Sequence, residues 1–180
     1  RHQNQLDFIL VDAKDGSSQT IFTENDAAYI DVTDNLTFLN DGKYFIWTSE
    51  KSGYNHIYLY NLKGKQVRQI TKGNYDVTDF YGIDESNNTV YFASSERSPM
   101  HRDVYAVQLN GKNKKTLTNK IGTNSATFST NYKYFINQYS NANTPYYFSL
   151  FDAKGNEVRI LKDNSNLNNN LAEYALSQKE

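Results

Sequence analysis

The 180-residue sequence contains no cysteine, only two prolines and one methionine. Without cysteine the chain can form no disulfide, no thiolate zinc site and no cysteine nucleophile. Its formal net charge is −1, which argues against a nucleic-acid partner because phosphate binding needs a clustered basic surface. No apolar run reaches the roughly 18 residues of a membrane-spanning helix, so we expect no membrane span in this segment.

Aromatic residues, in contrast, are abundant, with 15 tyrosines and 10 phenylalanines. Together with the scarcity of proline, this composition favours β-sheet over helix or disorder. The aromatic segments recur with a period of about 45 residues, a spacing typical of repeat architectures. The clearest register comes from glycines that follow the repeated strands, namely Gly16, Gly64, Gly111 and Gly155.

Each glycine has an aromatic or aliphatic strand before it, as in "HIYLYNL", and a more polar strand after it, as in "QVRQIT". The segments further upstream also align. Residues 41–52 match 87–98, with Glu50 and Glu96 in the same place, and 131–141 form a looser third copy. Each unit therefore predicts strand, tight turn, strand, loop, strand, glycine turn and strand. Such a four-stranded antiparallel meander of about 40–50 residues has the length of one β-propeller blade.

The residues within the strands favour stacked blades over an open sheet. Ile57 and Leu59 point to one face of their strand, and Tyr58 and Tyr60 point to the other. Apolar side chains on both faces are typical of a sheet that lies between two neighbours. The last strand of each unit is polar, as expected of an outer edge, and these strands carry Arg68, Gln69, Lys114, Lys115 and Arg159. The alternative is a β-sandwich with coincidental spacing.

We therefore predict an all-β fold of four-stranded antiparallel meanders, about three and a half blades of a larger β-propeller. Residues 1–163 form this partial propeller, in which 5–26 end one blade and the complete blades span 27–73, 74–119 and 120–163. Residues 164–180 are expected to form an exit segment with a short helix, because near-helical spacing relates Leu167, Leu171 and Tyr174.

Four segments carry a resemblance to a known family: "FLNDGKYFIWTSEKSGYNHIYLY", "QITKGNYDVTDFYGID", "TVYFASSERSPMHRDVYAVQLNG" and "LKDNSNLNNNLAEYALSQKE". They are similar to the last blades of the N-terminal propeller of the dipeptidyl peptidase IV family, in the prolyl oligopeptidase superfamily. The resemblance covers the chain from about Leu6 to Glu180. Its more specific parts are the "TKG" turn, the "YFASSERSPMHRDVY" stretch and the "DNSNLNNNL" exit.

The resemblance implies a serine exopeptidase that removes X-Pro or X-Ala dipeptides from peptide N-termini, with an eight-bladed propeller that caps an α/β-hydrolase domain. It also implies no cofactor, a possible homodimer and an exported location. Such a hydrolase carries its nucleophile in Gly-x-Ser-x-Gly, followed by Asp and His. The chain has no such motif, and it lacks the Glu-Glu pair with which the family binds the substrate amine. We therefore expect no catalytic residue in this chain. The expected partners are a hydrolase domain of the same protein and peptide substrates.

A non-enzymatic β-propeller that binds proteins or glycans is the alternative, because propellers host unrelated functions. The segment "DNSNLNNNLAEYALSQKE" discriminates between the two hypotheses. A binding propeller would close by returning a strand to its first blade, whereas this segment is typical of a connection to another domain.

The link between two blades, residues 27–35, carries the strongest candidate site. Such links run along one face of a propeller and deliver side chains near its central channel. In the family that this chain resembles, the corresponding stretch borders the pocket for the second residue of the substrate. The resemblance places Tyr29, Asp31 and Asp34 at the edge of that pocket, although the chain has no clear counterpart of the family's arginine. A purely structural link is the alternative.

Other polar residues are assigned structural roles. His56 and His101 are predicted to occupy equivalent loops of two blades, which indicates a repeat feature rather than a catalytic base. Residues 84–89 resemble a calcium loop but lack its sixth-position glycine and its later glutamate, so we predict a hairpin turn and no metal site. Glu24 and Asp26 are expected to be solvated loop acids.

Overall fold

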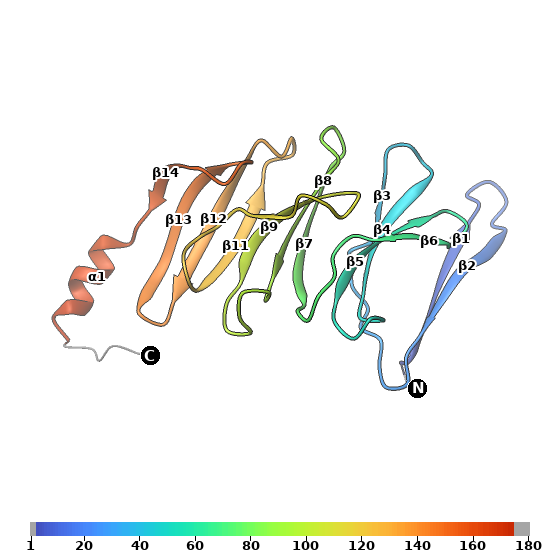
Figure 1. Cartoon of the computed structure of the whole chain (residues 1–180), viewed down its shortest axis with the longest axis horizontal. Coiled ribbons are helices and arrows are strands. Elements are labelled where there is room, and N and C mark those ends of the chain that lie inside the picture. Colours follow the sequence, from blue (N-terminus) through green and yellow to red (C-terminus); the bar gives the residue numbers. More distant parts are fainter. Residues whose placement is uncertain (1–2, 175–180) are drawn as a thin grey trace. The chain divides into compact units, whose positions relative to one another are not determined.

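The computed structural model describes residues 3–174 (Figure 1). In this range the chain forms 14 β-strands in four antiparallel sheets, together with one short helix. Three sheets have four strands in meander order and the first has two, which confirms the predicted all-β fold of four-stranded meanders. The chain divides into two compact units, Arg1–Gly73 and Asn74–Glu180.

The unit Arg1–Gly73 contains a two-stranded and a four-stranded sheet. The two-stranded sheet pairs β1 (Gln5–Val11) with β2 (Ser18–Asn25). The four-stranded sheet runs through β3 (Thr37–Phe38), β4 (Tyr44–Ser49), β5 (His56–Asn61) and β6 (Gln66–Gln69). In β5 the apolar side chains of both faces are buried, as the sequence predicts.

Stacked aromatic rings join these two sheets. Phe45, Trp47, Tyr58 and Tyr60 form a buried cluster, against which the two-stranded sheet packs its own rings. The Phe22 ring lies 4.8 Å from the Tyr60 ring, with an interplanar angle of 10°. Aromatic pairs of this geometry contribute about 0.5–1.5 kcal/mol beyond their buried area. Aromatic packing therefore fixes β1 and β2 against the four-stranded sheet.

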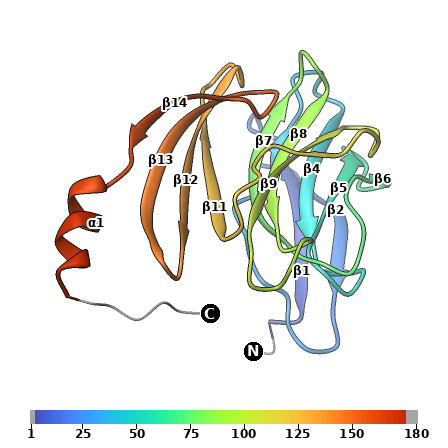
Figure 2. The ribbon, with the colours of Figure 1, turned by 60° about the vertical axis from the view of Figure 1, so that its left-hand side comes forward.

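The unit Asn74–Glu180 contains two four-stranded sheets and the helix (Figure 2). The first sheet runs through β7 (Val77–Asp84), β8 (Thr89–Ser94), β9 (Asp103–Gln108) and β10 (Lys115–Thr116). The second runs through β11 (Thr123–Phe128), β12 (Tyr134–Asn141), β13 (Thr144–Asp152) and β14 (Glu157–Lys162). The helix α1 (Ser165–Ala172) follows, as predicted, and buries no residue. Among residues 3–174 no helix is long and apolar enough to cross a membrane.

The two sheets of this unit share one apolar core. The first sheet contributes a tyrosine and small aliphatic residues, and the second contributes phenylalanines, so the cluster consists of Tyr91, Val104, Ala106, Leu117, Phe135 and Phe151. The Phe135 and Phe151 rings lie 5.2 Å apart at 18°. Adjacent sheets therefore pack through the faces on which the sequence places its aromatic residues.

The four glycines that set the repeat lie in the turns that the sequence predicts. Their φ angles are +74°, +73°, +78° and +88°, a region that glycine occupies at little cost because it has no Cβ. In each turn the glycine N–H donates to a carbonyl oxygen three or four residues earlier, at 2.7–3.0 Å. Each glycine thus closes the hairpin between the last two strands of its sheet.

One strand alignment predicted from the repeat is wrong by a single residue. Tyr44 pairs with Asn61, and Thr89 pairs with Gln108. Asn61 and Gln108 both begin the glycine turn of their sheet, so Tyr44 corresponds to Thr89. The sequence alignment matches Tyr44 with Val90 instead. The error matters because a shift of one residue moves every side chain of a strand to the opposite face.

The two histidines are not equivalent, contrary to the prediction. His56 is the first residue of β5 and is buried, and its Nδ1 atom lies 3.1 Å from the Thr71 hydroxyl. The equivalent place in the next sheet belongs to Asp103, which lies 3.5 Å from the Thr118 hydroxyl. His101 lies in the loop before β9. The packing of His56 supports its predicted structural role.

Tyr81 is expected to make the unit Asn74–Glu180 sensitive to alkaline pH. Its hydroxyl accepts a hydrogen bond of 3.1 Å from the Ala126 N–H, and burial raises the pKa of Tyr81 above its ordinary 10.0. Because the folded state holds this proton more tightly, the associated stability is fully present below pH 10.0 and is lost as the pH rises. The urea midpoint of the intact protein should fall between about pH 10 and pH 12, and fall less in Tyr81→Phe. An identical pH dependence in the two proteins would contradict this assignment.

Candidate functional site

The link of residues 27–35 lies between β2 and β3 and is held by hydrogen bonds at both ends. At its start, the Asp26 carboxylate accepts the backbone N–H two residues later at 2.8 Å, which closes a tight turn. In its second half, the side chains of Thr33 and Asn35 lie 3.4 and 3.0 Å from the Thr48 hydroxyl of β4. The four-stranded sheet therefore positions the second half of the link.

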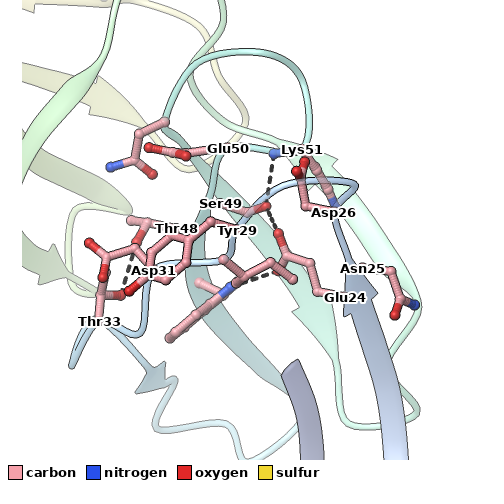
Figure 3. Close-up of a pocket in the computed structure, with 13 residues that line it drawn as sticks. Glu24, Asn25, Asp26, Tyr29, Asp31, Thr33, Thr48, Ser49, Glu50 and Lys51 are labelled. Carbon is pink, nitrogen blue, oxygen red and sulfur yellow. Dashed lines mark hydrogen bonds between the residues drawn. The ribbon is translucent and has the colours of Figure 1, made fainter. Parts of the chain in front are cut away.

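The link forms one wall of a small pocket (Figure 3). The pocket has a volume of about 60 Å³, which accommodates a small chemical group but not a whole ligand of the usual 300–1,000 Å³. The other walls come from the end of β2, from β4 and from the loop that follows β4. All these elements belong to the unit Arg1–Gly73.

Two of the three residues predicted for the site line this pocket. Tyr29 and Asp31 both contribute to its wall, and Tyr29 leaves 51% of its surface exposed. Asp34 is exposed and does not line the pocket. The structure therefore brings Tyr29 and Asp31 together and leaves Asp34 apart from them.

Glu24 is the centre of a hydrogen-bond network in the pocket wall (Figure 3). It lies half-buried in β2, and its carboxylate accepts hydrogen bonds from the Trp47 indole N–H at 3.2 Å and from the Ser49 hydroxyl. The prediction that Glu24 is a solvated loop acid is wrong, whereas Asp26 is exposed just before the link, as predicted. Trp47 is the residue that could have pointed to the role of Glu24, because a buried indole N–H needs a hydrogen-bond acceptor nearby.

Lys51 brings a positive charge close to this network. Its ammonium group lies 4.3 Å from the centre of the Tyr58 ring and 4.7 Å from that of Tyr60, and it contacts the Tyr60 hydroxyl. Burial lowers the pKa of Lys51, an effect that the negative charge of Glu24 opposes. Burial and the same charge raise the pKa of Tyr60. The Tyr60 phenol therefore stays neutral at physiological pH.

The charges of the pocket favour binding of a cation. The lining carries one ammonium group, from Lys51, and four carboxylates, so its net charge is −3. The carboxylates belong to Glu24, Asp26, Asp31 and Glu50. A pocket of this sign attracts groups such as a protonated amine. The described residues that line it include no histidine, so the pocket holds no Ser-His pair of the serine-protease type. Across residues 3–174, no group of three or more His, Cys, Asp or Glu is placed to hold a metal ion.

Comparison with known families decides where the chain belongs. Residues 1–146 match the family model described as the dipeptidyl peptidase IV (DPP IV) N-terminal region. The chain belongs to the dipeptidyl peptidase IV family. This DPP IV family is the one that the sequence motifs resemble, and the four-stranded sheets correspond to blades of its N-terminal propeller region.

Individual DPP IV relatives agree with the family match. The chain is similar to the crystal structure of Porphyromonas gingivalis dipeptidyl peptidase 4, with 42% identity and a TM-score of 0.87 over 94% of this chain and 24% of that one. It is 29% identical to dipeptidyl peptidase 4 of Arthroderma otae over 177 residues, which are 93% of this chain and 23% of the relative. The chain thus spans about a quarter of the length of these DPP IV proteins.

Proposed function

We propose that this chain is the non-catalytic propeller portion of a serine-type dipeptidyl peptidase that releases X-Pro or X-Ala dipeptides from peptide N-termini. The match of residues 1–146 to the DPP IV N-terminal region carries the proposal. Because the chain contains no Gly-x-Ser-x-Gly motif, an α/β-hydrolase domain of the same protein would supply the nucleophile. The relatives are about four times as long as the matched segment, which leaves room for such a domain.

In this proposal the repeat units are the blades of the propeller. Residues 5–26 end one blade, and complete blades span 27–73, 74–119 and 120–163. The pairing of β1 with β2, followed by three four-stranded sheets, supports this division. Residues 164–180 would lead from the last blade to the hydrolase domain. The helix α1 belongs to this exit segment, and residues 175–180 lie outside the described part of the chain.

We assign the link to the substrate side of the propeller, with Tyr29, Asp31 and Asp34 at the edge of the substrate pocket. There the propeller would restrict access and help to hold the peptide, and positioning of a reactant lowers the entropic part of the activation barrier. The pocket beside Tyr29 and Asp31 supports this role because it is negatively charged. Its volume of about 60 Å³ is too small for a dipeptide, so a second surface would have to complete it.

Replacement of the pocket-edge side chains Tyr29 and Asp31 should raise KM more than it lowers kcat. In the intact protein, Tyr29→Ala and Asp31→Asn are each expected to raise KM for a Gly-Pro chromogenic substrate about three- to tenfold, equivalent to roughly 1 kcal/mol of binding. We expect kcat to stay within about twofold, since neither residue would touch the reacting atoms.

The control for these variants is Val32→Ala. Val32 belongs to the same link, is 70% exposed and does not line the pocket, so its truncation should leave both kinetic constants unchanged. If Tyr29→Ala and Asp31→Asn behave like this control while the intact protein is active, the link has no contact with substrate. If the intact protein releases no dipeptide at all, the proposed enzyme class is itself wrong.

A further inference from the structure

A second cavity lies within the unit Asn74–Glu180, where the hairpin turns of its two sheets meet. Its walls come from the β7–β8 turn, from β8, β9 and β10, and from the turns that precede β12 and β14. The cavity has a volume of about 360 Å³. This volume lies in the range of 300–1,000 Å³ that is typical of small-molecule sites.

Three lysines from three different elements surround this cavity. Lys115 belongs to β10 and pairs there with Ala106. Lys133 and Lys154 lie in two turns whose backbones are fixed, because each donates its N–H to a turn side chain, at 3.2 Å and 2.9 Å respectively. All three side chains are exposed. The ion pairs recorded among residues 3–174 involve other cations, although Lys154 also interacts with the Asp152 carboxylate of its own turn.

The carboxylate that lines the cavity is already engaged. Asp84 accepts hydrogen bonds from the Ser86 N–H at 3.0 Å, from the Ser86 hydroxyl at 2.6 Å and from the Asn87 amide at 2.7 Å. Burial alone would raise the pKa of Asp84, but these hydrogen bonds outweigh it and hold the pKa below its ordinary value. Three ammonium groups against this one carboxylate leave the cavity with a net charge of +2.

The remaining lining offers both hydrogen bonds and apolar contact. Gln108 and Asn131 contribute amide groups, whereas Tyr91, Ala106 and Val107 are apolar and at least 96% buried, so they add a small apolar area. Lysine ammonium groups are point charges on flexible stems, so they suit clustered anionic oxygens without the bidentate geometry that arginine imposes. The positive charge suits anionic groups, the amides can donate hydrogen bonds to them, and the apolar area can contact a carbon skeleton.

We propose that this cavity binds a small organic anion that carries two or more carboxylate or phosphate groups on a carbon skeleton. The assignment rests on the unit Asn74–Glu180 alone and is independent of the proposed peptidase function. The cavity shares no lining residue with the pocket beside Tyr29, so occupation of one does not require the other.

The test is isothermal titration calorimetry of the intact protein with citrate, with fructose bisphosphate and with the neutral sugar maltose. We expect at least one anion to bind with a dissociation constant of about 1 mM or below, and binding to weaken as salt is added. Maltose should not bind. Binding of citrate alone identifies the ligand groups as carboxylates, and binding of the bisphosphate alone identifies them as phosphates. Absence of binding by both anions up to about 10 mM overturns the proposal.

Matched variants locate the binding site. Replacing two cavity lysines together, Lys133→Gln with Lys154→Gln, should weaken anion binding about tenfold, whereas Lys115→Arg keeps the charge and should retain binding. The control pair is Lys63→Gln with Lys65→Gln, which removes the same charge from a hairpin turn of the unit Arg1–Gly73. Equal affinities in the two double variants would show that the anion binds elsewhere and would overturn the assignment.

Discussion

Replacement of Gly64 by alanine is expected to lower the free energy of unfolding by about 3 kcal/mol or more. Gly64 has a φ angle of +73°, and a Cβ atom there would overlap the backbone carbonyl oxygen of Ile21 in β2. Strain at a positive φ costs about 1–3 kcal/mol, and overpacking against a fixed backbone costs a similar amount. Urea unfolding of the intact protein, followed by circular dichroism, measures the change.

Gly16→Ala is the matched control for this variant. Gly16 occupies the corresponding glycine turn with a φ angle of +74°, but a Cβ atom there would have no neighbour within 4 Å. Its replacement should therefore cost only the backbone strain, about 1–2 kcal/mol. Equal losses in Gly16→Ala and Gly64→Ala would mean that the Gly64 turn does not pack on β2.

Replacement of Glu24 by alanine is expected to lower the free energy of unfolding by about 2–4 kcal/mol. The change leaves the Trp47 indole N–H and the Ser49 hydroxyl without their acceptor, and both residues are at least 95% buried. A buried donor without a partner costs about 1–3 kcal/mol. Thermal unfolding of the intact protein measures this loss, which should appear as a lower midpoint.

Glu50→Ala provides the control for Glu24→Ala. Glu50 lines the same pocket and carries the same charge, but it is exposed. Its removal should change the free energy of unfolding by no more than about 0.5 kcal/mol, as is usual for surface substitutions. If the two variants lose the same stability, the charge of the pocket matters and the hydrogen bonds of Glu24 do not.

The glycine turns could be predicted because their physical cause is local. A positive φ angle favours glycine, which has no Cβ, so Gly16, Gly64, Gly111 and Gly155 could be recognised as turn residues from the sequence. Strand register depends instead on which face of a strand is apolar. In β8 both faces are apolar, since Val90, Tyr91 and Phe92 are all buried. The strand therefore lacks the alternation of apolar and polar residues that would fix its register. An alignment shifted by one residue still matches apolar residues with apolar residues.

The candidate site could be predicted only in part, because its residues come from separate segments. Tyr29 and Asp31 lie in a single link, and the resemblance to a family could identify them together. The sequence predicts Glu24 to be a loop acid because it stands just before a new blade, and its partners Trp47 and Ser49 are more than 20 residues away. Contacts between strands of different sheets leave no periodic signal. A lone buried tryptophan was the one indication that an acceptor must be near.

The most direct test of the whole account is the hydrolysis of a Gly-Pro chromogenic substrate by the intact protein, with the corresponding Gly-Gly compound as control. A propeller that belongs to a serine dipeptidyl peptidase predicts release of the chromophore from Gly-Pro but not from Gly-Gly. It also predicts loss of this activity after treatment with a serine-reactive fluorophosphonate. A folded intact protein that cleaves neither compound, or whose cleavage resists the fluorophosphonate, would contradict the account and favour a propeller that only binds.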